Sequence, residues 1–182
     1  MADERDGARG LAEGQTPGEH GARLEALARR FGPSDVDARH EGDDLCVEVA
    51  AAGLPDLCSF LRDAPDFLCD YPADLFATDT GEAIVLRYRL HSTALGHVLR
   101  IRVALPRDAA DVPSVTHIWP GMNWHERECY DLFGVHFRGH PDVPCPGHMR
   151  ILLPEDWEGH PFRKDYVPMF AGDPLHGPQE TN

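Results

Sequence analysis

The sequence predicts an α+β fold in which two helices pack on a mainly antiparallel sheet, followed by a short helix and an extended C-terminal arm. Three observations support this prediction. Two helical patterns and a pair of strongly alternating strands come first, a short helix with marked ends follows, and prolines then recur every seven residues. A length of 182 residues suits a single domain with a substantial core.

The first third of the chain contains a tail, two helices and a strand. Residues 1–20 are polar and glycine-rich, so we expect a disordered tail. Apolar residues from Leu24 to Phe31 share one helical face. Residues 44–50 alternate as in a strand with one buried face, and the spacing from Leu54 to Leu61 predicts a second helix that can hold Pro55 in its first turn.

The middle of the chain carries the clearest strands. Residues 67–78 are rich in large apolar side chains, but Pro72 predicts a broken or edge strand there. Ile84–Leu90 and Leu99–Leu105 alternate and are joined by a short link, which predicts an antiparallel hairpin. A loop or short helix is expected over residues 106–113. The outer face of the hairpin is basic, and a solvated sheet face fits it slightly better than a docking surface; its cations are Arg87, Arg89, Arg100 and Arg102.

A short helix is predicted from Asn123 to Phe133. Asn123 is a suitable N-cap, Glu126 completes a capping box, and Gly134 can end the helix in the left-handed conformation. Arg127 and Asp131 are four residues apart and can pair. The charges are crowded between aromatic residues, so a solvated face and a partly buried ion network at a contact between subunits fit equally well.

The segment from Arg150 to Phe170 has no sustained hydrophobic period. Its prolines forbid a continuous helix, yet it carries several large apolar side chains. These groups either fold back onto the domain or are covered by another protein, and we favour the second interpretation. They are Trp157, Phe162, Tyr166, Met169 and Phe170.

Charge and composition exclude several classes. The net charge of −14 argues against direct binding to nucleic acid or to an anionic membrane surface. No apolar run approaches the roughly 20 residues that span a bilayer, and the N-terminus lacks the core of a signal peptide. We therefore expect a soluble chain that reaches a membrane only through partners. Its thiols are predicted to be reduced and buried, without iron–sulfur ligand spacing: Cys46, Cys58, Cys69, Cys129 and Cys145.

No catalytic arrangement stands out. His125 and Glu126 begin a zinc-protease helix motif, but Cys129 stands where the second histidine is needed. We expect no catalytic residue, no cofactor-binding residue and no metal ligand on this chain. A less favoured alternative is a small zinc-binding protein, because four residues in one proline-rich loop have the spacing of a structural zinc site: His136, His140, Cys145 and His148.

Three segments resemble one family in sequence and order: Glu126–Gly134, Gly139–Asp142 and Arg150–Pro161. The family is the C subunit of the proton-pumping NADH:quinone oxidoreductase (respiratory complex I), also called the 30-kDa subunit family. The resemblance covers roughly residues 21–170 of this chain. The chain departs from the family pattern at Val143–Met149, which is longer and lacks the usual leucine and paired arginines before Ile151.

The resemblance implies a compact α/β domain with an extended C-terminal segment lying on a neighbouring subunit. It implies a non-catalytic core subunit that braces the quinone-reducing module in the hydrophilic arm and packs against the 49-kDa subunit (the D subunit), near cluster-bearing subunits. NADH, flavin, iron–sulfur clusters and quinone are then bound by partner subunits, at the cytoplasmic face of the cell membrane. The alternative is the same scaffold role in a related membrane-bound hydrogenase or a deazaflavin-dependent dehydrogenase.

These inferences divide the chain into four parts. They are a disordered tail (1–20), a compact α/β domain (21–139), an extended arm docking on a partner subunit (140–170) and a second disordered tail (171–182). The residues expected at the contact between subunits lie in the short helix and the arm: Glu126, Arg127, Glu128, Asp131, Arg150, Trp157, His160, Arg163, Lys164 and Asp165.

Overall fold

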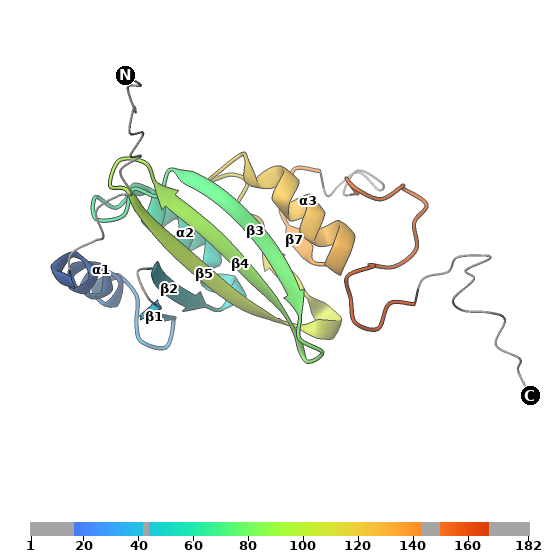
Figure 1. The fold of residues 1–182 in the computed structure, drawn as a ribbon, viewed down its shortest axis with the longest axis horizontal. Helices are drawn as coiled ribbons and strands as arrows, with labels where there is room; N and C mark the ends of the chain where they lie inside the picture. The colour runs from blue at the N-terminus through green and yellow to red at the C-terminus, as the bar shows by residue number, and fades with distance from the viewer. Residues whose placement is uncertain (1–16, 42–43, 143–149, 168–182) are drawn as a thin grey trace, which may run out of the picture.

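A five-stranded sheet with the order β1-β2-β5-β4-β3 forms the centre of the computed structural model, which describes residues 17–41, 44–142 and 150–167 (Figure 1). Neighbouring strands are antiparallel except β2 and β5, which run parallel, so the predicted mainly antiparallel sheet is confirmed. The strands are β1 (Val36–Glu41), β2 (Asp44–Val49), β3 (Tyr71–Asp79), β4 (Ala83–Ser92) and β5 (His97–Pro106).

The helices and a second, two-stranded sheet complete the fold. A parallel pair of short strands, β6 and β7, flanks α3 in the sequence. The α1 helix includes residues 17–20, which the sequence predicts as tail. The elements are α1 (Pro17–Arg30), the 3₁₀ turns η1 (Ala51–Gly53) and η2 (Arg107–Ala109), α2 (Leu54–Asp63), β6 (Asp111–Pro113), α3 (Met122–Phe133) and β7 (His136–Arg138).

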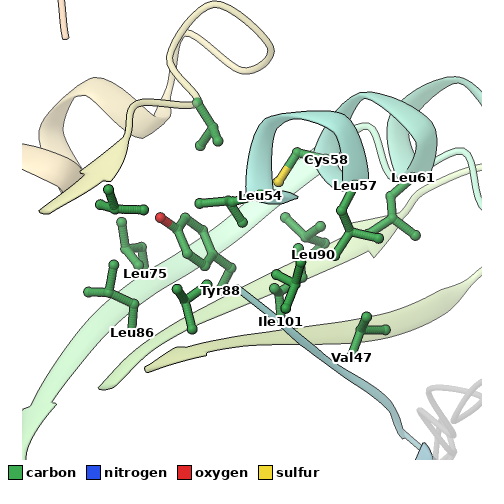
Figure 2. Packing of buried hydrophobic residues seen from close by; sticks show 14 of the residues in the cluster. Val47, Leu54, Leu57, Cys58, Leu61, Leu75, Leu86, Tyr88, Leu90 and Ile101 are labelled. Carbon is green, nitrogen blue, oxygen red and sulfur yellow. The ribbon is translucent and has the colours of Figure 1, made fainter. Parts of the chain in front are cut away.

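The α2 helix supplies the centre of the core. Leu54, Leu57, Cys58 and Leu61 recur at helical spacing, and all four are fully buried. Figure 2 shows α2 lying across the strands, with these side chains directed toward apolar residues of the sheet. Burying each leucine contributes about 2 kcal/mol, so this face of the sheet is where the fold is most strongly stabilised.

The β3 strand lies at the edge of the sheet, as Pro72 predicts. The register with β4 shifts between Pro72 and Asp74, which marks a bulge. Proline cannot donate to the ladder, so a bulged edge strand is where the sheet tolerates it. The opposite edge strand, β1, is not indicated by the sequence. Its apolar residues that pack on the domain are the small Val36 and Ala38, and they alternate with charges.

The α3 helix begins two residues earlier than an N-cap at Asn123 predicts. Gly121 is the N-cap and makes no side-chain capping bond, so the prediction of Asn123 as N-cap is wrong. The side-chain amide of Asn123 instead donates to Asp142 at 3.2 Å. The predicted capping box is wrong as well, because Glu126 is turned into the interior.

The C-terminal end of α3 agrees with the sequence. Gly134 has a φ of 73°, and its amide donates to the carbonyl of Tyr130 at 2.8 Å. An L side chain rarely adopts this conformation, which explains the glycine. Beyond it, the described part of the C-terminal arm, residues 150–167, follows an irregular path of bends and turns beside α3 (Figure 1). We call residues 150–167 the arm below.

Candidate subunit interface: the arm and its anchors

The arm is fastened to α3 at Asp131, whose side chain is fully buried. One carboxylate oxygen accepts hydrogen bonds from the backbone amides of Ile151, Leu152 and Leu153, at 3.1, 2.8 and 2.8 Å. The other oxygen accepts from the guanidinium of Arg150 at 2.6 Å. We call this group the Asp131 anchor, and it gives one buried carboxylate four donors from a single stretch of chain.

These donors decide the charge of the anchor. Burial alone raises the pKa of the Asp131 carboxyl, but the backbone amides and Arg150 outweigh it, so the pKa lies below its ordinary value. Asp131 is therefore a carboxylate at neutral pH. Since its pKa is depressed in the folded chain, the stability it contributes is present at neutral pH and is lost as the pH falls into the acid range.

Arg127 does not pair with Asp131, so that prediction is wrong. Its guanidinium donates to the carbonyl of Arg150 at 2.8 Å and lies 4.0 Å from Asp142. Arg150 in turn donates to the carbonyls of Trp157 at 2.7 Å and Gly159 at 3.1 Å. The two guanidiniums thus link α3 to the beginning and the middle of the arm.

His160 closes the arm over the end of α3. Its Nδ1 donates to the carbonyl of Asp131 at 3.0 Å, and the next turn of the arm adds a bond from the amide of Phe162 to the carbonyl of Leu132. A Cβ built on Gly134 would lie 2.5 Å from the His160 ring. Burial lowers the pKa of His160, which favours the neutral ring in this position. Gly134 is thus required both by its φ and by this close approach.

A second buried carboxylate, Asp79 at the end of β3, fastens the far part of the arm. It accepts from the guanidinium of Arg107 at 3.0 Å and from the backbone amide of Lys164 at 2.9 Å. Arg107 also pairs with Asp165 of the arm at 2.6 Å. The bonds from Arg107 hold the pKa of Asp79 well below its usual range. We call this group the Asp79 anchor.

Glu126 lies in the interior of the domain rather than on its surface. One oxygen accepts from the backbone amide of Val115 at 2.8 Å, and the other is buried without a hydrogen-bond partner in the described part of the chain. Burial raises its pKa to about 7, against the lowering effect of the Val115 amide and of Ser114. A carboxyl in this environment takes up a proton near neutral pH.

The structure separates the ten predicted contact residues by exposure. Two are buried and hold the chain together, namely Glu126 and Asp131. The half-buried ones are Arg127, Arg150, Trp157, His160 and Arg163, and the exposed ones are Glu128, Lys164 and Asp165. Sequence reasoning missed Asp79 and Arg107, because they lie 85 and 58 residues from their arm partners and no local spacing signals such a bond.

The sequence leaves two possibilities for the large apolar side chains of the arm, which are folding back onto the domain or being covered by another protein. In the structure some of these side chains are half-buried and others are exposed. Trp157 and Tyr166 are half-buried, and the Tyr166 ring lies close to Gly159 of the arm itself. Phe162 packs edge-on against Phe133 at 5.6 Å but remains 60% exposed. The most exposed apolar side chains of α3 and the arm, which we call the apolar ridge, are Trp124 (71%), Leu152 (60%), Phe162 (60%) and Val167 (77%). Met169 and Phe170 lie outside the described residues.

The predicted zinc loop is only partly described, since Cys145 and His148 fall outside the described ranges. His136 lies 2.7 Å from a carboxylate oxygen of Asp111. His140 uses both ring nitrogens, one toward the carbonyl of Asn123 at 3.2 Å and one toward the amide of Asp142 at 3.1 Å. Within residues 17–41, 44–142 and 150–167, no three histidine, cysteine, aspartate or glutamate side chains are placed to hold a metal ion.

A small α+β domain that fixes an extended arm by polar anchors and leaves a ridge of apolar side chains exposed is typical of a subunit of a larger assembly. The chain belongs to the family described as "Respiratory-chain NADH dehydrogenase, 30 Kd subunit", whose model matches residues 47–170. The predicted family is confirmed.

Known proteins agree with this assignment. The chain is 46% identical over 115 residues to the C subunit of the NADH-quinone oxidoreductase of Chlorobium phaeobacteroides. The match covers 62% of this chain and 66% of that relative, so this chain spans slightly less than two thirds of the relative's length. A trypsin-resistant fragment of Nqo5 has a TM-score of 0.57 and 26% identity, and covers 68% of this chain and 98% of the fragment. A chain of an archaeal membrane-bound sulfane sulfur reductase shares the fold, with a TM-score of 0.67 and 23% identity, over 82% of this chain and 86% of that one. In the described ranges, no helix combines the length and the apolar character that crossing a membrane requires.

Asp131→Asn is expected to loosen the arm. An amide at this position loses the charge paired with Arg150, and its NH2 group must face either the Arg150 guanidinium or the backbone amides, so one set of donors loses its acceptor. We expect trypsin cleavage after Arg163 to accelerate roughly tenfold or more at neutral pH, as the population of the released arm increases. The control is Asp156→Asn, because Asp156 is exposed on the same arm. Equal cleavage rates in the two variants would show that the Asp131 anchor does not hold the arm.

Gly134→Ala tests the close approach of His160. Gly96, in the turn between β4 and β5, also has a positive φ of 68°, but a Cβ there would meet nothing within 4 Å. Gly96→Ala therefore carries only the backbone penalty, about 1 kcal/mol. We expect Gly134→Ala to lower the free energy of unfolding by about 1 kcal/mol or more beyond that, from crowding against the imidazole. Urea unfolding of both variants measures the difference, and equal losses would contradict it.

Glu126→Gln is expected to remove a pH dependence of stability. The folded-state pKa of about 7 exceeds the model-compound value of 4.5, so the wild-type chain loses stability as the pH rises from 4.5 through 7. The glutamine keeps the acceptor for Val115. We expect the variant to match the wild type at pH 4 and to exceed its free energy of unfolding by up to roughly 3 kcal/mol at pH 8.

Glu128→Gln is the control for this measurement, because Glu128 is exposed on the same helix. Its difference from the wild type should stay small at both pH values. A Glu126→Gln variant that is less stable than the wild type at pH 8 would contradict the buried, protonated carboxyl.

Proposed function

We propose that this chain is a brace subunit of a membrane-associated NADH:quinone oxidoreductase and supplies no catalytic residue of its own. The observation that carries the proposal is the pair of buried carboxylates, Asp131 and Asp79, which fix the arm in place while its apolar side chains remain exposed. An arm held in this way offers a rigid apolar edge to a neighbouring subunit.

The physical advantage of the anchors is preorganisation. Ordering an extended segment on binding costs roughly 1–2 kcal/mol for each backbone residue, and that cost reduces affinity. Here the hydrogen bonds to Asp131 and Asp79 order the arm before any partner arrives. The apolar ridge then contributes its burial to association, at about 25 cal/mol per Å² of apolar surface removed from water.

The ridge lies on two elements that a single partner can cover together. Trp124 projects from the first turn of α3, and Leu152 lies two residues beyond Arg150, whose guanidinium ties the arm to that helix. Charged residues beside the ridge, Glu128, Lys164 and Asp165, are exposed and suit a polar rim around an apolar contact. We assign the contact between subunits to these residues, with Arg127, Arg150, Trp157, His160 and Arg163 beneath them.

The identity of the assembly is inferred from relatives. Their name supports NADH as electron donor and quinone as acceptor for the whole assembly. In our proposal the 49-kDa subunit (the D subunit) is the partner on the arm, and flavin, iron–sulfur clusters and quinone are bound by other subunits, with the chain peripheral at the cytoplasmic face of the membrane. The second candidate is the same brace role in a related membrane-bound complex, which the shared fold of the sulfane sulfur reductase chain favours.

The double variant Trp124→Ser/Leu152→Ser tests the proposal. Both side chains are more than half exposed, so the isolated chain should keep its stability within about 0.5 kcal/mol per site. In the complex, we expect loss of most co-purifying oxidoreductase subunits and a parallel loss of NADH:quinone activity in membranes. At about 1–2 kcal/mol for each of the two lost contacts, the affinity should fall by roughly thirtyfold to a thousandfold.

Leu95→Ser is the matched control. Leu95 is also an exposed leucine, at 42%, but it lies in the turn between β4 and β5. Its substitution should leave co-purification and activity unchanged. Full assembly of the double variant would rule out the apolar ridge as the contact. If the wild-type chain co-purifies with other chains but with no NADH-oxidising subunit, the result would favour the second candidate, the brace role in a related membrane-bound complex.

A further inference from the structure

The outer face of the sheet carries a second exposed surface that the brace role does not use. In Figure 1 the strands β3, β4 and β5 cross in front of α2, and no helix of the described chain covers their near side. Two large side chains of β3 are exposed there, Tyr71 at 55% and Phe76 at 46%. Their cross-strand neighbours on β4 are His91 and Arg87.

Arginines form two directly opposed pairs on this face. Arg87 lies opposite Arg102, and Arg89 lies opposite Arg100, in the antiparallel register of β4 and β5. Like charges in such positions destabilise a sheet unless counter-charges are supplied. Among the described residues, carboxylates form ion pairs with the β5 arginines and not with the β4 arginines.

The β5 arginines are neutralised from within the chain. Arg100 is paired with Asp44, and Arg102 with Glu48, both on the neighbouring strand β2. Glu48 also lies 3.8 Å from Arg39 of β1. On the β1-β2-β5 half of the sheet, cations and carboxylates therefore alternate.

The β4 arginines have no carboxylate partner among the described residues. Arg87 donates to the hydroxyl of Thr78 at 3.0 Å and lies 5.8 Å from the centre of the Phe76 ring. Arg89 is exposed. Asp74 lies opposite Arg89 in the register, and its carboxylate is 4.0 Å from His125 of α3. Within the described residues, Arg89 makes no ion pair with it. Two arginines beside two exposed aromatic rings form what we call the aromatic–basic patch: Tyr71, Phe76, Arg87 and Arg89.

We infer that the aromatic–basic patch is a docking surface for an acidic, extended segment of another subunit of the same assembly. Tyrosine, phenylalanine and arginine are the residue types that anchor protein interfaces, and the missing counter-charges of Arg87 and Arg89 call for carboxylates from outside. The inference rests on the proposed function, since it takes the chain to be part of an assembly.

The experiment places the photo-cross-linking residue p-benzoylphenylalanine at one position at a time in the full chain, within the complex purified from cells that produce it. Position 71 reports on the patch, and the ring of Tyr71 makes this replacement conservative. Position 152 reports on the apolar ridge. We expect position 71 to cross-link to a segment of another subunit that is rich in aspartate and glutamate. Arg89→Glu in the same chain should lower that yield about fivefold, the loss of one charge contact.

Arg29→Glu is the control, because it reverses an exposed charge on α1, away from the patch; it should leave the yield from position 71 unchanged. Cross-linking at position 152 but not at 71 would overturn the docking surface and leave the brace role intact. No cross-link at either position would overturn both. Cross-links from position 71 to lipid, to nucleic acid or to this chain's own residues would also overturn the inference, as would a yield that Arg89→Glu does not change.

Discussion

The fold of the C-terminal half depends on one constraint, which is that the Asp131 carboxylate is buried and must be supplied with donors. A buried carboxylate without partners costs several kcal/mol. Within the described structure its side-chain oxygens receive donors only from residues 150–153 of the arm. The end of α3, the glycine that terminates it and the start of the arm are therefore one unit, and the position of the apolar ridge on the arm is set by this carboxylate.

The two anchors use polar contacts where a folded chain ordinarily uses apolar ones. Asp131 and Asp79 bind backbone amides and guanidiniums, so the arm is held without burying its largest side chains. Hydrogen bonds are directional and fix the arm in one register. The apolar surface of Leu152, Phe162 and Val167 is left available for another chain. The polar anchors therefore set the orientation of the arm, while the exposed apolar side chains would supply the affinity for a partner in the proposed assembly.

The sequence predicted those parts of the fold that local patterns encode. Helical spacing located α2, alternation located the β4–β5 hairpin, and the proline at position 72 indicated an edge strand. Local spacing failed at Glu126, since a capping box and a buried acid look alike in a sequence and differ only in what surrounds them. It also failed for the Asp79 anchor, whose partners come from η2, after β5, and from the arm far along the chain. The charge cluster of α3 left a solvated face and an ion network equally open, and did not indicate that two of its acids would face inward.

The outer face of the sheet shows a second contrast, between arginines with and without an ion pair. On β5 each arginine has a carboxylate from β2, while on β4 two arginines lie beside exposed aromatic rings without one in the described structure. A chain with a net charge of −14 has many acidic residues that could have been placed there. Since opposed arginines lower stability, leaving this half positive costs the isolated chain free energy that a partner's carboxylates would recover. An acidic partner would also be attracted to this half over long range, whereas the rest of the chain repels it. The electrostatic pattern therefore favours one orientation of approach, and burial of the exposed aromatic rings of β3 would then hold the partner in place.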